Sequence, residues 1–312
     1  MSRMRRPAPL PPHLADQALT RGLLVEEGIR PERLYRTDMT PISRGIHRSG
    51  AEDLSAQDHA AALAASLPET CLSHVTAAAA LGLWLPPEVR GDPRIHLTQP
   101  AGTTLRIRRP GVVSHRRPLP EGQLMEIGGV PTTTPARTWF DLSSVCSVRH
   151  LVMLGDHLVR APRPKFEGRA HPHATPEELR TTIDSSGKVR GKRRAREALQ
   201  LIRVGADSPP ETALRLSLTE AGLPEPELQV PPAPRLAEWF PADLGYPRLK
   251  IAIQYDGEPH FSPERARWDQ TRNNEFRTRD WLLLLFNRDD HRDGFRRAVR
   301  QVAAAIATRT QQ

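Results

Sequence analysis

The chain has 312 residues, of which 38% are hydrophobic, and 45 lysines and arginines outnumber 36 aspartates and glutamates to give a net charge of +9. This length predicts two or three domains, and no apolar run is long enough to span a membrane. Arg3, Arg5 and Arg6 are not followed by the apolar segment of a signal peptide, so we expect a cytoplasmic protein.

The excess of basic residues favours an anionic partner, above all nucleic acid. A proline- and arginine-rich composition typical of high-GC genomes is the alternative explanation. The two cysteines, Cys71 and Cys146, make neither a disulfide framework nor a metal motif. We expect both to be buried thiols.

Residues 1–16 are rich in proline and predict a disordered tail. Residues 17–52 predict a winged-helix-like module, with helices over Ala18–Glu27 and Pro31–Arg36 and a strand over Ile42–Arg48. A basic surface on a protein-interaction module is an equally good interpretation. The candidate DNA contacts in the module are Arg30, Arg33, Arg36, Arg44 and Arg48.

Residues 53–160 predict an α+β domain. Helices are expected within residues 55–85, and three antiparallel strands over Arg94–Thr98, Thr104–Arg108 and Val112–Arg116. His74 opens one of the helices and is interpreted as a capping or core residue rather than a ligand.

The end of this domain predicts two more helices, Trp139–Leu142 and Val148–Arg160. Thr134 is placed to cap the first of them, with Pro135 at the first helical position. Arg137 and Asp141 are four residues apart, which predicts an ordinary ion pair along the helix.

Residues 161–207 predict a linker followed by a strongly basic helix over Lys188–Arg203. Such a helix can follow the phosphates of a nucleic acid, and a solvated helix surface is the equally weighted alternative. The residues expected to bind phosphate are Lys188, Arg190, Lys192, Arg193 and Arg194.

Residues 208–312 predict a domain built around a hairpin. The apolar run Lys250–Tyr255 predicts a buried strand that ends at Asp256, and Pro247 separates it from an earlier strand carrying Asp243. The two carboxylates are then expected to meet at one end of the sheet, with His260 just beyond the turn. Carboxylates in this arrangement can bind a hard divalent cation.

Further elements complete this domain. Ser208 to Glu211 predict a capping box with proline at the first helical position. Asp269 and Arg272 lie on a polar helix over Pro263–Arg279 and predict an i,i+3 ion pair. Trp281–Phe286 predicts a central strand buried on both faces, reached by a crossover that favours parallel pairing with the strand over residues 249–255. A helix over Arg292–Thr308 follows.

The domain resembles the uncharacterised family related to very-short-patch repair endonucleases, within the PD-(D/E)xK or restriction-endonuclease-like fold. Gln254 stands where that family usually has a glutamate. The matching residues are Ser208 to Glu211, Gly222 to Pro224, Asp243, Ile253, Tyr255, Asp256, Gly257, His260, Asp269, Arg272 and Trp281 to Phe286.

The resemblance implies a mixed central sheet flanked by helices and a Mg²⁺- or Mn²⁺-dependent endonuclease acting on DNA. The implied metal ligands are Asp243, Asp256, the Gln254 side chain and the Tyr255 carbonyl. His260 and Glu211 are further implied catalytic residues, and Arg272 is an implied nucleic-acid-binding residue. Because Gln254 brings no negative charge, the alternative is a catalytically degenerate fold that acts as a DNA-binding regulator or antitoxin-like factor. Hydrolysis of RNA is a third interpretation.

The middle of the chain carries a second resemblance. The segments SHVTAAAALGL, VVSHRR and VPTTTPARTWFDL are similar to the C-terminal region of AbiEi-like antitoxins of type IV toxin–antitoxin systems, which in actinobacterial proteins often precedes the nuclease-like domain. This resemblance implies a toxin or another protein partner. The expected fold class is therefore a multidomain α+β protein with a winged-helix-like N-terminal region and a restriction-endonuclease-like C-terminal α/β domain.

Overall fold

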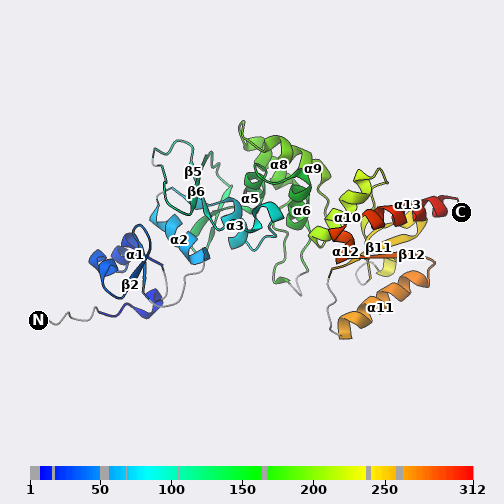
Figure 1. The fold of residues 1–312 in the computed structure, drawn as a ribbon, viewed down its shortest axis with the longest axis horizontal. Coiled ribbons are helices and arrows are strands. Elements are labelled where there is room, and N and C mark those ends of the chain that lie inside the picture. Colours follow the sequence, from blue (N-terminus) through cyan, green and yellow to red (C-terminus); the bar gives the residue numbers. More distant parts are fainter. Residues whose placement is uncertain are drawn as a thin grey trace, which may run out of the picture. The chain divides into compact units, whose positions relative to one another are not determined.

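A computed structural model describes residues 8–15, 18–49, 56–67, 69–104, 106–163, 167–236, 240–257 and 263–311. The chain divides into two compact units, each described by itself below: Met1–Val145 with Thr181–Lys192, and Cys146–Arg180 with Arg193–Gln312. Both contain helices and sheets (Figure 1), so the expected mixed α+β class is confirmed. Within the described ranges no helix is long and apolar enough to cross a membrane.

The first unit begins with a small three-stranded antiparallel sheet, in the order β1-β3-β2. Its elements are β1 (Ala18–Thr20), α1 (Arg21–Glu26), a 3-10 turn (Pro31–Tyr35), β2 (Met39–Ser43) and β3 (Ile46–Ser49). The single helix predicted over Ala18–Glu27 is wrong at its start, because Thr20 ends β1 and caps α1 by accepting a hydrogen bond from the Leu23 N–H at 3.2 Å. The predicted strand over Ile42–Arg48 is two strands, because Gly45 turns the chain with a φ of 77°.

Buried leucines hold this module together. Leu14, Leu19, Leu24, Leu34 and Met39 form one cluster. The described part of the expected tail is therefore packed rather than disordered, since Leu14 is buried there.

The arginines of this module differ in their surroundings. Arg48 is buried, and Arg33 donates two hydrogen bonds to Asp38. Arg30, Arg36 and Arg44 are exposed. Only these three therefore match the prediction of a free basic surface.

The rest of the first unit is a five-stranded sheet in the order β6-β5-β4-β8-β7, with helices packed on it. Leu63, Leu72, Ala77 and Leu97 form its buried core. The elements are α2 (Ala56–Ser66), β4 (Cys71–Leu72), α3 (His74–Ala80), α4 (Pro87–Arg90), β5 (Ile95–Pro100), β6 (Val112–Arg117), β7 (Leu124–Ile127), β8 (Val130–Thr133) and α5 (Pro135–Leu142).

Two predictions for this sheet are wrong. β5 and β6 pair in parallel, from Ile95 opposite Val112 to Pro100 opposite Arg117. The chain therefore returns after β5 to the end of the sheet at which β5 began, and β6 starts there. The described residues of the expected strand Thr104–Arg108 are not in a strand. Alternation along a strand encodes its buried face but not the direction of its neighbour.

The start of α5 confirms one prediction and extends another. The Thr134 hydroxyl accepts the Arg137 N–H, as the capping prediction required, and the helix begins at Pro135 rather than Trp139. The Arg137–Asp141 ion pair is present at 2.9 Å, but both side chains are buried. Arg137 also donates to the Pro118 carbonyl and the Gln123 side chain. The pair therefore anchors α5 instead of lying on an exposed helix face.

The expected linker is largely helical. It contains α8 (Pro176–Ser185) and α9 (Lys192–Leu201), and Leu179, Ile183, Ala195 and Ala198 are buried. The basic helix therefore begins at Lys192 and not at Lys188. In the second unit, α6 (Val148–Val159) packs against α10 (Pro209–Glu220), where Asp156 and Arg215 form a buried ion pair at 2.9 Å.

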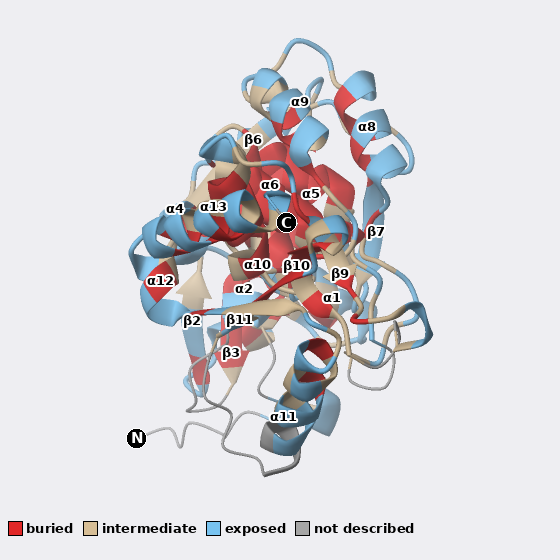
Figure 2. Ribbon diagram, turned by 90° about the vertical axis from the view of Figure 1, so that its right-hand side faces the viewer, coloured by how far each residue is buried: buried red, intermediate tan, exposed pale blue. Residues whose placement is uncertain are grey.

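The second unit ends in a four-stranded mixed sheet, ordered β12-β11-β10-β9. Its strands are β9 (Glu227–Val230), β10 (Ala242–Tyr246), β11 (Ile251–Asp256) and β12 (Leu282–Asn287), and its remaining helices are α11 (Pro263–Arg277), α12 (Arg288–Arg292) and α13 (Arg296–Thr310). The helix α11 lies on one side of the sheet and α10 and α13 lie on the other (Figure 1). From Arg267 onward, most residues of α11 are exposed (Figure 2).

The pairings in this sheet test the predicted hairpin and crossover. β10 and β11 are antiparallel, and β11 and β12 are parallel with α11 between them, so both predictions are confirmed. The prediction that Trp281–Phe286 is central and buried on both faces is wrong. β12 is at the edge of the sheet, and Leu285 is 39% exposed.

Candidate functional site

The hairpin places Asp243 directly beside Gln254. The antiparallel register sets Leu244 opposite Ile253, so the residues before and after them face each other across the two strands. The Gln254 side-chain amide donates to Asp243 Oδ1 at 2.8 Å, and the Tyr255 N–H donates to Asp243 Oδ2 at 2.7 Å. The carboxylate of Asp243 is therefore held in place by the neighbouring strand.

A second buried carboxylate comes from the first turn of α10. Glu211 is 6% exposed and accepts hydrogen bonds from the Asp207 N–H at 2.9 Å and the Ser208 hydroxyl at 2.7 Å. The predicted capping box is wrong in detail, because the Ser208 side chain does not cap the helix N–H groups. Its hydroxyl donates to the buried Glu211 carboxylate instead. Leaving a buried carboxylate without a donor costs more free energy than leaving a helix N–H group uncapped.

The two carboxylates oppose each other's ionisation. Burial raises the pKa of Glu211 well above its ordinary value, and the charge of Asp243 raises it further. Burial also raises the pKa of Asp243 to about 7, although the Tyr255 N–H and the charge of Arg272 act in the opposite direction. Two negative charges in one poorly solvated site are unfavourable without a cation.

Arg272 is the cation that acts on this site. It lies on α11, is 4% exposed, and pairs with Asp269 at 3.2 Å as predicted. Its guanidinium also lies 5.1 Å from the centre of the Trp268 ring. An arginine this buried on a polar helix is directed toward the sheet rather than toward solvent.

The remaining predicted ligands are spread out. Asp256 is exposed at the end of β11. The Tyr255 ring points to the other face, where it contacts Phe295 and His291. The predicted ligand atom of Tyr255 is its backbone carbonyl oxygen, and this stays a prediction. His260 lies outside the described residues.

The basic residues predicted to bind phosphate fall into two classes. Lys188, Arg190 and Arg193 are exposed, and Arg193 forms an ion pair with Glu197 at 3.2 Å. Lys192 donates to the Ser186 carbonyl, and Arg194 donates to the Cys146 carbonyl. The first class is available to a ligand, while the second is committed to the fold.

A cluster of three histidines in the first unit was missed by sequence reasoning. Among the described residues, one group of histidine, cysteine, aspartate or glutamate side chains brings three ligand atoms within 4.8 Å of one another, and it is His74, His96 and His115. Asp243, Asp256 and Glu211 do not form such a group. The histidines are 22 and 19 residues apart and match no metal motif, and only the parallel pairing of β5 and β6 reveals that they meet.

Comparison with known proteins adds little about activity. No family model matches the chain. It is 30% identical over 131 residues to an uncharacterised protein of Mycobacterium tuberculosis, found in strains CDC 1551 and H37Rv. The match covers 42% of this chain and 47% of that protein, so the chain spans less than half the length of the relatives it matches.

Proposed function

We propose that the chain is a DNA-binding protein whose C-terminal domain has the restriction-endonuclease-like fold and hydrolyses phosphodiesters with Mg²⁺ or Mn²⁺. The observation that carries the proposal is a pair of mutually repelling carboxylates, the half-buried Asp243 and the buried Glu211. The order helix, three antiparallel strands, helix and parallel strand in this domain supports the mixed sheet flanked by helices that the resemblance implies.

The donor set suits a hard divalent cation. Carboxylate oxygens are the ligands that Mg²⁺ prefers, and a dication would relieve the repulsion that raises the pKa of Glu211. Asp243 and Glu211 would hold the ion. The Gln254 side-chain oxygen accepts the Asp243 N–H at 3.4 Å and would become a neutral ligand only if the side chain turned over. When bound, such an ion polarises a phosphoryl oxygen and lowers the pKa of its water.

Other residues of the chain would bind and orient the phosphate groups of the substrate. The charge of Arg272 acts on Asp243, and a guanidinium suits the two oxygens of a phosphate. Asp256 is exposed at the end of the same strand, where a DNA backbone can reach it. The exposed Lys188, Arg190 and Arg193 would add phosphate contacts that do not depend on sequence.

One observation favours the alternative of a DNA-binding regulator or antitoxin-like factor. The Gln254 amide already donates to Asp243 Oδ1 at 2.8 Å and so occupies the position in which the family's glutamate would attract a cation. The N-terminal module supports the same alternative, because its short helix, 3-10 turn and terminal hairpin are compatible with a small winged-helix-like reader of DNA.

A plasmid-nicking assay run beside a gel-shift assay tests both functions. The wild type is compared with Asp243→Asn, with Glu211→Gln, and with Asp289→Asn as a matched control, since Asp289 is exposed on α12. Metal-dependent nicking that is lost in the first two variants and kept in the third supports the nuclease. DNA binding without cleavage supports the regulator, and an RNA substrate run in parallel tests which nucleic acid is used. The absence of both binding and cleavage would overturn both proposals.

A further inference from the structure

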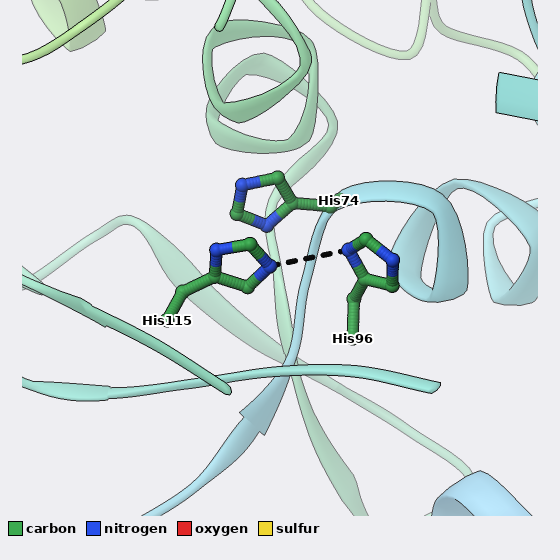
Figure 3. Close-up of side chains that lie close together, drawn as sticks. All are labelled: His74, His96 and His115. Carbon is green, nitrogen blue, oxygen red and sulfur yellow. Dashed lines mark hydrogen bonds between the residues drawn. The ribbon is translucent and has the colours of Figure 1, made fainter. Parts of the chain in front are cut away.

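Three ring nitrogens meet inside the first unit. His74 is the first residue of α3, His96 lies on β5 and His115 lies on β6. One ligand nitrogen from each lies within 4.8 Å of the others, and His115 Nε2 is 3.1 Å from His96 Nδ1. Figure 3 shows the three rings facing one another. The start of one helix and two strands therefore bring three imidazoles together.

The cluster is oriented by neighbouring polar groups. Asp92 Oδ2 lies 3.2 Å from His96 Nε2, the nitrogen that faces away from His115. The Ser73 hydroxyl lies 3.0 Å from His74 Nδ1 and accepts a hydrogen bond from Thr98 at 2.7 Å. Histidines that bind metals usually donate their second nitrogen to a carboxylate or another acceptor in this way.

The hydrogen bonds fix where the protons are. Asp92 also accepts hydrogen bonds from the Arg94 backbone N–H at 3.0 Å and from the Arg94 guanidinium at 2.8 Å. A carboxylate paired in this way only accepts, so His96 Nε2 is the donor in its contact with Asp92. His96 Nδ1 is then an acceptor, and His115 Nε2 donates to it. The proton between His115 Nε2 and His96 Nδ1 thus occupies the place that a metal ion would take between these two nitrogens, which are 3.1 Å apart.

All three rings are neutral, and His115 must in addition move its proton from Nε2 to Nδ1 before its Nε2 can bind a metal. Burial is the main reason that the pKa of each is lowered, to about 4 for His115 and in the same direction for His74 and His96. Neutral imidazole has a free lone pair, so a metal need not first displace a charge from the rings.

We propose that His74, His96 and His115 bind a first-row transition metal of the Zn²⁺ class, with Asp92 orienting His96. Imidazole nitrogens suit Zn²⁺ and its neighbours, whereas Mg²⁺ and Ca²⁺ require oxygen ligands. Zn–N bonds of about 2.0–2.1 Å in a tetrahedron give nitrogen separations of about 3.4 Å. The 3.1 Å pair is close to that value. A pair at the 4.8 Å limit would have to close by about 1.4 Å, which requires the His74 ring to turn out of its stack on His115.

The metal would tie the start of α3 to two strands of the sheet. His74 has a positive φ of 51°, a conformation that is rare outside glycine and that directs its ring into the cluster. The ordinary alternative is a set of neutral histidines stacked in the core, since the His74 and His115 rings are 3.6 Å apart and nearly parallel. The two interpretations differ in one measurable property, which is metal affinity.

The test uses the full chain without a histidine tag, freed of metal with a chelator and titrated with Zn²⁺ and Co²⁺. We expect one ion per chain, a Co²⁺ absorption spectrum typical of nitrogen ligands, and a higher melting temperature with Zn²⁺. His96→Gln and His115→Gln should each weaken binding at least about 100-fold. Asp92→Asn keeps all three ligands and should weaken it about 10- to 100-fold.

Two controls separate this site from others. His157 is half-buried and stacks on His173 without belonging to a three-ligand group, so His157→Gln should bind as tightly as the wild type. With excess Mg²⁺ present to occupy the proposed carboxylate site, Asp243→Asn should keep the Co²⁺ absorption spectrum of nitrogen ligands, which distinguishes the histidine site from the proposed Mg²⁺ site. The proposal is overturned if the wild type does not bind Zn²⁺ at micromolar concentration, or if folded His96→Gln, His115→Gln and Asp92→Asn variants all bind like the wild type.

Discussion

Replacing Asp243 by asparagine should stabilise the metal-free protein at high pH. The pKa of this carboxyl rises from an ordinary value of 3.8 to about 7, mainly through burial. The folded protein therefore holds the proton more tightly than the unfolded chain does. The contribution to stability is complete below pH 3.8 and is lost as the pH rises through about 7.

The size of the effect follows from the shift. Each pKa unit corresponds to about 1.4 kcal/mol, so ionised Asp243 costs about 4 kcal/mol above pH 7, and about 3 kcal/mol of that cost develops between pH 5 and pH 8. Asparagine does not ionise, so the variant has no such cost. Its oxygen can still accept the Tyr255 N–H, and its amide can donate to Gln254 once the Gln254 side chain turns over.

Urea unfolding of both proteins at pH 5 and pH 8, followed by tryptophan fluorescence, measures this difference. The stability of Asp243→Asn relative to the wild type should rise by about 3 kcal/mol between the two pH values, and Mg²⁺ at pH 8 should stabilise the wild type but not the variant. A relative stability that does not change with pH would refute the raised pKa. Destabilisation at both pH values would show that the fold requires an ionised carboxylate there.

Three further predictions follow from individual contacts. Gln254→Glu removes the hydrogen bond to the Asp243 carboxylate and should destabilise the metal-free protein by about 1–3 kcal/mol. Mg²⁺ should raise the melting temperature of this variant more than that of the wild type. Thermal melts in which neither protein responds to Mg²⁺ would contradict the proposed Mg²⁺ site. Asp156→Asn leaves the buried Arg215 with one carboxylate partner, Glu225 at 2.7 Å, and should cost about 1–3 kcal/mol in urea unfolding. A loss below about 0.5 kcal/mol would show that the ion pair with Glu225 is sufficient to hold the arginine. Arg190→Gln with Arg193→Gln should reduce the slope of log affinity for duplex DNA against log salt by up to about two; an unchanged slope would assign both residues to solubility.

Local patterns in the sequence were enough for the framework of the C-terminal domain. Pro247 and the apolar run ending at Asp256 predicted the β10–β11 hairpin, and the length of polar chain before Trp281 predicted a parallel crossover. The Thr134 cap of α5 is also local. These features depend on residues within a few positions of one another, so their chemistry can be read along the chain.

Only the tertiary structure decided which elements become neighbours. The edge position of β12, the parallel pairing of β5 and β6, and the packing of α8 and α9 in the expected linker all depend on distant partners. The same is true of the side chains that meet. Ser208 donates to Glu211 because that carboxylate is buried, and His74, His96 and His115 converge because β6 lies beside β5. A periodic pattern specifies which face of an element is buried, whereas the surface that covers that face is chosen by the free energy of the whole packed chain.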